Sequence, residues 1–133
     1  MGAQDDDIEI VKLFIQRCND HKVAEDETLA MFTDNASFHD PRFSAFEGKE
    51  AVAGFFKRLA QENQLIDALW TPINTFTERG QVCVQWEVIN QRHMGSTEIF
   101  IEGCSIFRLR GGKIYYYRGY WNPMKATRKK ALS

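Results

Sequence analysis

The sequence predicts a single domain of the α+β class, in which N-terminal helices lie on one face of an antiparallel sheet. Three observations predict this class. Apolar residues recur at helical spacing through the first half of the chain. From Leu65 onward the apolar pattern changes to a period of two residues, which is typical of strands. The 133 residues are 44% hydrophobic, which suffices for one core without disulfide bonds or a structural metal.

Three helices are expected in the first half of the chain. The first follows an acidic run at residues 5–7, which suits the positive end of a helix dipole. Its apolar stripe consists of Ile8, Val11, Phe14, Ile15 and Cys18. A second, short helix is expected over residues 25–32. The third begins at Gly48, and we interpret its apolar stripe, Val52, Phe55, Phe56 and Leu59, as core.

Strands are expected after the second helix. A short strand over residues 36–40 ends at Pro41, which cannot donate a backbone hydrogen bond. Four longer strands are expected over residues 65–78, 82–91, 98–110 and 114–121, and three glycine-containing turns separate them. Helices followed by a run of antiparallel strands gather on one face of the sheet.

Charge and composition exclude several classes of function. The chain has 17 basic and 18 acidic residues, whereas a nucleic-acid-binding protein usually has a basic surplus. The three cysteines, Cys18, Cys83 and Cys104, lie far apart and show no metal-ligand spacing. No phosphate-binding loop, dinucleotide fingerprint, nucleophile elbow or zinc-protease motif is present in the sequence. We therefore expect no nucleic-acid partner, no metal and no cofactor.

The N-terminal residues and the lengths of the apolar runs predict a soluble protein. The N-terminal residues are acidic, where a signal peptide needs basic residues and an apolar region. No apolar run approaches the roughly 18 residues of a membrane span. We expect a cytoplasmic protein without membrane contact. The domain is expected over residues 1–124, and residues 125–133 are interpreted as a basic, solvated C-terminal tail.

Strand parity predicts a homodimer. In residues 98–110, one face is almost continuously apolar and is assigned to the helices, while the other mixes apolar and charged residues. The apolar outward residues of the last two strands are Phe100, Cys104, Ile106, Tyr116 and Tyr120. Because an exposed apolar patch of this kind is unusual for a monomer, a second copy is expected to cover the outer sheet face.

Asp40 is the most informative carboxylate in the sequence. Parity groups it with Ala36 and Phe38 on the inward side of the short strand, where it would face aromatic residues. A carboxylate in such a place is a candidate general base. In the other interpretation, Asp40 only hydrogen-bonds the turn formed by Pro41 and Arg42. The residues alone leave both interpretations open.

Two stretches of the chain carry a family resemblance. The first comprises residues 38–41 (FHDP), 46–52 (FEGKEAV) and 55–56 (FF), and the second residues 103–108 (GCSIFR), 112–114 (GKI) and 118–122 (RGYWN). They resemble the SnoaL-like and ketosteroid isomerase-like families of the nuclear transport factor 2-like superfamily, over roughly residues 8–122. The resemblance implies a cystatin-like cone: a curved antiparallel sheet around three helices, with a pocket at the open end.

The resemblance also implies catalytic residues. In the isomerases the Asp of an Asp-Pro step is the general base, and this position is Asp40 here. Their oxyanion is held by a Tyr and a protonated Asp, at positions that are Phe14 and Ser105 in this sequence. The acid/base Asp of the SnoaL-type cyclases corresponds to Asn122. We therefore expect Asp40 as the base, with Tyr117 or Ser105 as the hydrogen-bond donor.

The expected reaction is isomerisation or cyclisation of a small apolar carbonyl compound by proton transfer. Ten residues are expected to bind it: Phe14, Cys18, Phe38, Phe56, Trp70, Trp86, Ile101, Phe107, Tyr115 and Trp121. One alternative is a non-catalytic module that holds an apolar ligand. The other is a dimeric interaction protein whose cone is filled by its own aromatic side chains. A pocket open to solvent with Asp40 at its base favours the first two functions, and a filled cone favours the third.

Overall fold

The computed structural model describes residues 3–43, 45–66, 68–90 and 98–122. The first half of the chain forms α1 (Ala3–Asn19), α2 (Asp26–Leu29), β1 (Phe32–His39), β2 (Phe46–Glu47) and α3 (Lys49–Ile66). The second half forms β3 (Ala68–Glu78), β4 (Gln81–Asn90), β5 (Glu98–Arg110) and β6 (Lys113–Trp121). Helices thus precede the four long strands, and the predicted α+β class is confirmed.

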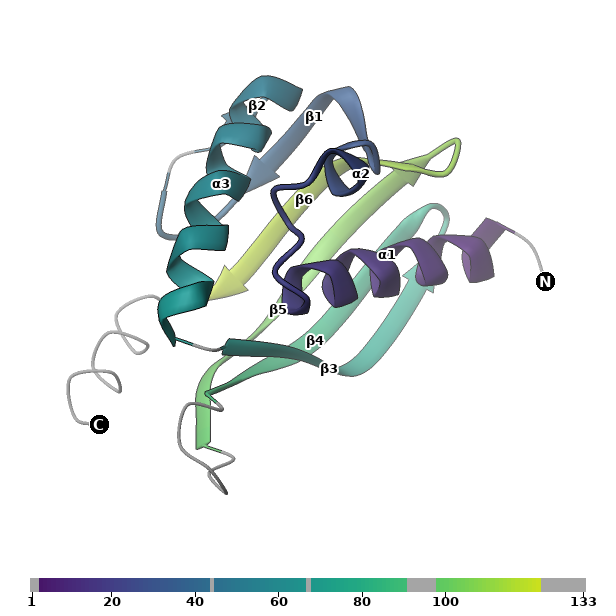
Figure 1. Cartoon of the computed structure of the whole chain (residues 1–133). Coiled ribbons are helices and arrows are strands. Elements are labelled where there is room, and N and C mark those ends of the chain that lie inside the picture. Colours follow the sequence, from purple (N-terminus) through teal and green to yellow (C-terminus); the bar gives the residue numbers. More distant parts are fainter. Residues whose placement is uncertain (1–2, 44, 67, 91–97, 123–133) are drawn as a thin grey trace.

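The six strands form one curved sheet in the order β2-β1-β6-β5-β4-β3 (Figure 1). Consecutive long strands pair antiparallel, as expected. The β1–β6 pair is parallel, with Phe38 opposite Tyr117. The expected sheet is mostly antiparallel, and this one parallel pair arises because the chain continues from β1 through β2, α3 and three long strands before it returns beside β1 in the same direction.

The long helices cover one face of the sheet, which is the expected layer arrangement. Figure 1 shows α1 lying across β3 and β4, and α3 lying against β1 and β2. The core between them is aromatic. The Phe14 ring of α1 lies 5.3 Å from Phe32, 5.9 Å from Phe56 and 5.9 Å from Phe107, measured between ring centroids. One side chain therefore joins α1 to β1, α3 and β5.

Three boundaries differ from the prediction. The second helix ends at Leu29 rather than at residue 32, because Phe32 is fully buried and starts β1. The Ile114 amide, which donates to the Met31 carbonyl, fixes this early start of β1 against β6. The sequence pattern does not predict β2, because a strand of two residues shows no periodicity. Helix α3 runs on to Ile66, beyond the predicted strand start at residue 65.

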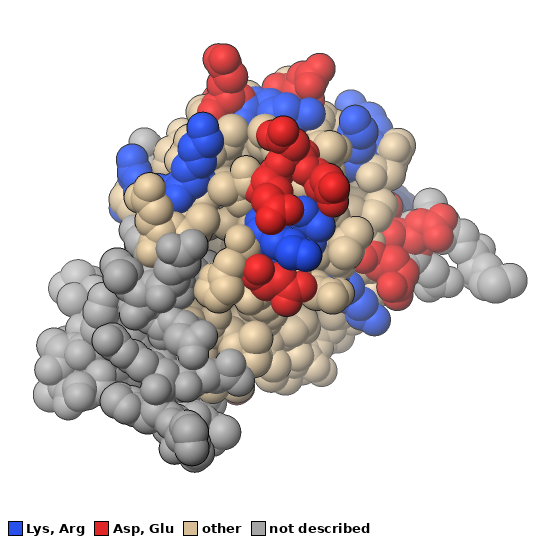
Figure 2. Space-filling view, in the orientation of Figure 1, with Lys and Arg blue, Asp and Glu red and all other residues tan. Residues whose placement is uncertain are grey.

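Several expectations fall outside the described residues. The basic tail at residues 125–133 and the turn at residues 94–96 lie outside them, as does the side chain of Phe100. Within the described part of the chain, no helix is long and apolar enough to cross a membrane. On the face that carries the helices, acidic and basic side chains are interspersed (Figure 2).

Substitution of Gly103 tests how closely β5 packs against its neighbours β4 and β6. A Cβ at this position would stand 2.8 Å from the Trp121 Cβ and 3.1 Å from the Trp86 Cη2, and would also press on the Tyr120 carbonyl oxygen. Gly103→Ala should therefore lower the free energy of unfolding by about 1–3 kcal/mol in denaturant titrations.

The matched control is Gly54 in α3, where an added Cβ would meet nothing within 4 Å. Gly54→Ala should raise the free energy of unfolding by about 0.5–1 kcal/mol, because alanine loses less backbone entropy in a helix. Equal effects of the two substitutions would contradict the packing described for Gly103.

Candidate functional site

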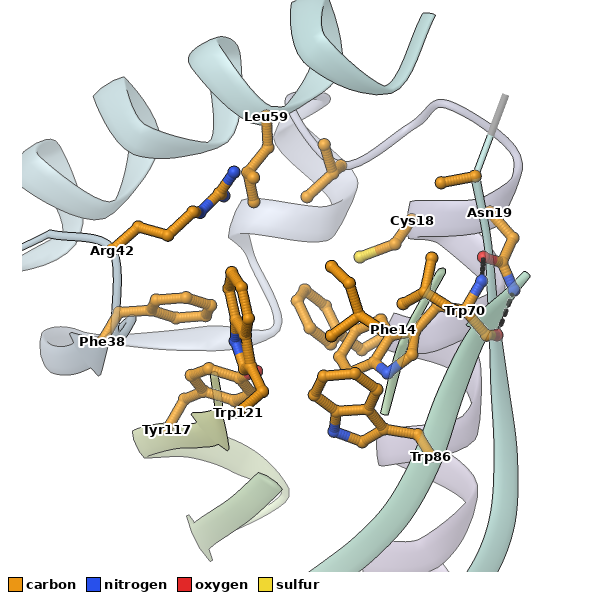
Figure 3. A pocket seen from close by; sticks show the side chains of 14 residues that line it. Phe14, Cys18, Asn19, Phe38, Arg42, Leu59, Trp70, Trp86, Tyr117 and Trp121 are labelled. Atoms are coloured by element: carbon orange, nitrogen blue, oxygen red, sulfur yellow. Dashed lines mark hydrogen bonds between the residues drawn. The ribbon is translucent and has the colours of Figure 1, made fainter. Parts of the chain in front are cut away.

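A cavity of about 170 Å³, partly open to solvent, lies between α1 and the concave face of the sheet (Figure 3). Its wall is mainly apolar and aromatic, and all three tryptophans of the chain take part. The lining residues are Phe14, Cys18, Asn19, Val23, Phe38, Arg42, Leu59, Ala68, Trp70, Trp86, Val88, Ile101, Tyr117 and Trp121. An apolar cavity of about 150 Å³ can hold benzene, so this one has room for about one ring.

Small residues lie opposite tryptophans on the inner face of the sheet. Gly103 pairs with Trp86 on one side and with Trp121 on the other. In the next inward row, Ser105 pairs with Gly119. A Cβ at Gly119 would stand 3.0 Å from the Tyr117 Oη and 3.5 Å from the Trp121 Nε1. The small residues thus let the side chains of Trp86, Tyr117 and Trp121 lie close against the strands, and these side chains line the cavity.

A buried chain of hydrogen bonds runs from Trp86 through Ser105 to Tyr117. The Trp86 Nε1–H donates to the Ser105 Oγ at 2.8 Å, and the Ser105 Oγ lies 2.9 Å from the Tyr117 Oη. An indole N–H can only donate, so Ser105 accepts at this end of the chain. Either hydroxyl can donate in the second bond. If Ser105 donates, the phenol proton of Tyr117 is left for a ligand in the cavity.

Packing holds the Tyr117 ring in one orientation. It stacks on Phe38 with centroids 4.0 Å apart and meets Phe107 edge-on at 5.0 Å. Burial raises the pKa of the Tyr117 phenol well above its ordinary value. The hydrogen bond from Ser105 opposes this shift, and the negative charge of Asp40 adds to it. Tyr117 is therefore a protonated donor at neutral pH and cannot serve as a base there.

Asn19 ties the end of α1 to the start of β3. Its side-chain amide donates to the Trp70 carbonyl at 2.8 Å and accepts from the Trp70 amide at 2.7 Å (Figure 3). This pair of bonds fixes where Trp70 enters the cavity wall. Among the described residues, the buried Trp70 indole N–H has no hydrogen-bond partner. Trp70 thus brings to the wall a second donor, for which the described part of the chain supplies no acceptor.

Cys18 contributes a thiol to the wall. Burial raises its pKa strongly, and the nearby charge of Arg17 opposes the shift only in part. The thiolate is the nucleophilic form of cysteine, so this thiol acts as apolar surface. Within residues 3–43, 45–66, 68–90 and 98–122, no three His, Cys, Asp or Glu side chains converge as metal ligands would.

Arg42 is the charged residue among those described in the cavity wall. It follows β1 and Pro41, and its side chain reaches over the cavity in the direction of Leu59 (Figure 3). Its guanidinium lies 5.4 Å from the Trp121 ring centroid and is paired with Asp40, with 3.3 Å between Nε and Oδ1. The side chain is 31% exposed, so it marks the solvent-facing end of the cavity, called the mouth below.

The sequence matches the SnoaL-like domain family over residues 11–117, which is most of the chain. The chain belongs to the SnoaL-like family. The matched segment includes the second half of α1, the aromatic core and Tyr117, and it ends just before Trp121. The family resemblance expected from the sequence is therefore confirmed. No curated protein has a matching sequence.

Solved structures share the fold of this SnoaL-like chain. SalBIII, an epoxide hydrolase/cyclase-like enzyme of pyran ring formation in the polyether salinomycin, has a TM-score of 0.70, with 23% identity over 90% of this chain and 92% of that chain. A candidate polyketide cyclase from Xanthomonas campestris pv. campestris has a TM-score of 0.72, with 16% identity over 92% and 94%. A nuclear transport factor 2-like protein from Cytophaga hutchinsonii has a TM-score of 0.67, with 17% identity over 89% and 91%.

Eight of the residues predicted for the site lie on the wall of the SnoaL-like cavity. They are Phe14, Cys18, Phe38, Trp70, Trp86, Ile101, Tyr117 and Trp121. Three others lie behind the wall, which corrects their predicted contact with a ligand. Phe56 and Phe107 are fully buried against Phe14 and belong to the core. Ser105 is fully buried and reaches the cavity only through its hydrogen bond to Tyr117.

Asp40 lies outside the cavity wall, which corrects its predicted place. The parity prediction holds for Ala36 and Phe38, which are buried, but β1 ends at His39. The Asp40 Oδ1 accepts hydrogen bonds from the Arg42 amide at 2.9 Å and from the Arg42 Nε at 3.3 Å. These bonds turn the carboxylate into the loop, as the turn interpretation of the sequence proposed.

Tyr115 is predicted to face the cavity, but it lies on the other face of the sheet, because β6 contains a bulge. The register places Arg108 opposite Tyr116 and Leu109 opposite Ile114, so Tyr115 is the extra residue between them. Ile114 therefore takes the inward position and is fully buried. The Tyr115 ring lies 4.8 Å beneath the Arg110 guanidinium, away from the cavity.

Six wall residues were absent from the predicted binding set: Asn19, Val23, Arg42, Leu59, Ala68 and Val88. Three had a usable signal. Asn19 follows Val11 and Ile15 at steps of four residues, Leu59 ends the apolar stripe of the third helix, and Val88 shares the strand parity of Trp86. Arg42 had none, because it lies in an irregular segment where no periodicity fixes the direction of a side chain.

Ser105 provides a test of the buried hydrogen-bond chain. Ser105→Ala removes the acceptor of the Trp86 N–H and leaves that buried donor unpaired, so the free energy of unfolding should fall by about 1–3 kcal/mol. The control is Thr33→Ala, which removes an exposed hydrogen bond to Asn35 and should change it by less than about 0.5 kcal/mol. Equal losses in the two variants, measured by chemical denaturation, would contradict the chain described here.

Proposed function

We propose that this protein binds a small, largely apolar molecule with a carbonyl oxygen and isomerises or cyclises it by proton transfer. The observation that carries the proposal is the hydrogen-bond chain from Trp86 through Ser105 to Tyr117, which ends in an aromatic cavity. A cavity with apolar walls and few convergent polar groups is the usual form of a small-molecule site.

Tyr117 is the proposed donor to the ligand oxygen. The Trp86 N–H binds one lone pair of Ser105, the Ser105 hydroxyl can donate to Tyr117, and the phenol proton then points to the ligand. Each bond in such a chain polarises the next, which strengthens the last donor. As a carbonyl becomes an enolate during proton transfer, negative charge grows on its oxygen. One well-placed donor stabilises such a charge by about 2.7–4 kcal/mol.

Asp40 is the proposed base. Its charge contributes to the raised pKa of Tyr117, which supports a position near the cavity. To take a proton from a ligand carbon, the Asp40 carboxylate has to turn away from Arg42 and toward the cavity. The proposed reaction therefore requires that the Asp40–Arg42 ion pair at the mouth opens.

A non-catalytic ligand-binding module is the second candidate. The hydrogen bonds from Arg42 to Asp40 favour it, because they hold the carboxylate outside the cavity wall. The family and the fold allow both functions, since one scaffold carries many chemistries. SalBIII, described as an epoxide hydrolase/cyclase-like enzyme, supports ring formation as a reaction class for the first candidate.

The test uses tryptophan fluorescence, because all three tryptophans line the cavity. Small one-ring ketones and enones should change this fluorescence on binding. For any such compound that is turned over, Tyr117→Phe should lower kcat about 100- to 1,000-fold and affinity much less. Asp40→Asn should abolish turnover and leave affinity nearly unchanged. Because burial raises the pKa of Tyr117, the rate should not fall through loss of this donor until the pH is well above 10.

The matched control is Tyr116→Phe, which removes a neighbouring phenol that stacks on Arg108. It should leave both kcat and affinity unchanged. Binding without turnover, with affinities that Tyr117→Phe does not alter, would reject the proton-transfer reaction and favour the binding module.

We also propose that two copies associate through the outer sheet face. Phe76 is 63% exposed there, opposite Cys83 in β4, and Tyr120 is 45% exposed on β6. Three further residues of the predicted patch, Cys104, Ile106 and Tyr116, are half-buried. An outer face with these apolar side chains is typical of a surface that a partner covers.

Sedimentation at micromolar concentration tests the association. The wild type should have about twice the 15.4 kDa mass of the chain, and Phe76→Lys should shift it to the monomer. Leu13→Lys, on the opposite layer in α1 and 48% exposed in the wild type, is the control and should remain dimeric. A monomeric wild type would overturn the proposed dimer.

A further inference from the structure

Two cysteines that are far apart in the sequence come together on the outer face of the sheet. In the β4–β5 ladder, Cys83 lies opposite Ile106 and Cys104 lies opposite Gln85. Paired residues, and residues two positions apart on one strand, share a face of the sheet, so the two cysteines are diagonal neighbours on the same face. Both side chains are half-buried and line one hollow of the outer face, about 470 Å³ in volume.

The two thiols are in contact with each other. Burial raises the pKa of the Cys83 thiol, and the charge of Cys104 and a hydrogen bond to its sulfur add to this shift. Cys83 is therefore a protonated thiol at neutral pH. A group that binds its sulfur has to displace this proton, as metal ions do when they bind cysteine.

Aromatic rings flank the thiol pair on both sides. Phe76 of β3 lies opposite Cys83, and Tyr120 of β6 lies opposite Cys104. Both rings are exposed, whereas the thiols are half-buried, so the sulfur atoms lie lower in the face than the rings beside them. An apolar shell of this kind limits the access of water to a metal bound by thiolates.

The diagonal arrangement favours a bridging ion over a disulfide bond. Diagonal neighbours in a sheet have Cα atoms about 7–8 Å apart, whereas a disulfide bond needs a separation of about 4.4–6.8 Å. An ion between two thiolates adds two metal–sulfur bonds of about 2.3 Å each and spans a wider gap. Among the described residues, no three potential ligands converge, so zinc would lack its usual four. Thiolates also select Cu(I), which is stable with two of them.

We infer that Cys83 and Cys104 form a two-thiolate site for a soft, monovalent metal ion such as Cu(I). The ion bonds to both sulfur atoms, and both thiol protons pass to the solvent, so no oxidation or reduction takes place. The sequence predicts no metal, because the spacing of the cysteines along the chain hides a pair that the strand register creates. The site lies on the outer face of the sheet and is separate from the proposed small-molecule function.

The test is a titration under nitrogen against the coloured complex of Cu(I) with bicinchoninate, from which a tighter site removes the ion. The wild type should take up one Cu(I) per chain, and X-ray absorption should show two sulfur neighbours of the ion. Loss of a partner outside the ligand shell lowers metal affinity about 10- to 100-fold, so loss of a ligand in Cys83→Ser or Cys104→Ser should lower it more than about 100-fold.

The matched control is Cys18→Ser, which removes the thiol of the cavity wall and should leave the uptake and the affinity for Cu(I) unchanged. Circular dichroism checks that each variant is folded. The site belongs to one chain, so the uptake should be one Cu(I) per chain at about 1 and at about 50 μM protein, whether or not two copies associate. An uptake of one Cu(I) per two chains would overturn the site as described.

No uptake of Cu(I) by the wild type, or an affinity that either of the two outer-face serine variants retains, would overturn the inference. Peptide mapping of protein exposed to air gives a second measurement. A disulfide bond between Cys83 and Cys104 would contradict the spacing argument and with it the preference for a metal ion. These outcomes leave the proposed function standing, because Tyr117 and the cavity lie on the other face of the sheet.

Discussion

The packing of the Phe14 ring joins α1 to the sheet, and both the core and the cavity depend on it. One side of the ring meets Phe32, Phe56 and Phe107, all fully buried. The ring also meets Trp70 edge-on at 6.1 Å and lines the cavity. The same residue therefore closes the core and forms the inner end of the site. Gly103 and Gly119 let the rings of Trp86, Tyr117 and Trp121, which line the cavity beside Phe14, lie close against the strands.

The site combines an apolar wall with a small number of polar groups, and each group is held by a different device. Buried hydrogen bonds fix Tyr117, a two-bond clamp from Asn19 fixes Trp70, and an ion pair with ring stacking fixes Arg42. In low dielectric, an unpaired donor is expensive to bury, so the Trp70 N–H, which has no partner among the described residues, favours a ligand that carries oxygen. The SnoaL-like fold supplies the cavity, and Tyr117, Trp70 and Arg42 supply the polar groups of its wall.

The sequence predicts the direction of a side chain only where the helix or strand around it has a regular period. It places Trp86, Ile101 and Trp121 on the inner face because their strand segments alternate without interruption. It fails at Tyr115, where a bulge inserts one residue and reverses the parity. Asp40 shows a second limit, because strand parity points it inward while the Asp-Pro turn offers the carboxylate two donors from Arg42. The place of Arg42 in the cavity wall could not be predicted from the sequence, since it lies in an irregular segment and its guanidinium lies over Trp121, which is far away in the chain.

The most direct test of the account is a crystal structure of the protein with bound 4-phenylbutan-2-one, a one-ring ketone. The account predicts that the phenyl ring lies among Trp70, Trp86 and Trp121, and that the ketone oxygen lies about 2.6–3.2 Å from the Tyr117 Oη. The Ser105 Oγ should remain bonded to both Trp86 and Tyr117. A ketone oxygen that points to solvent, or a ring bound outside the cavity, would contradict Tyr117 as the donor around which the site is built.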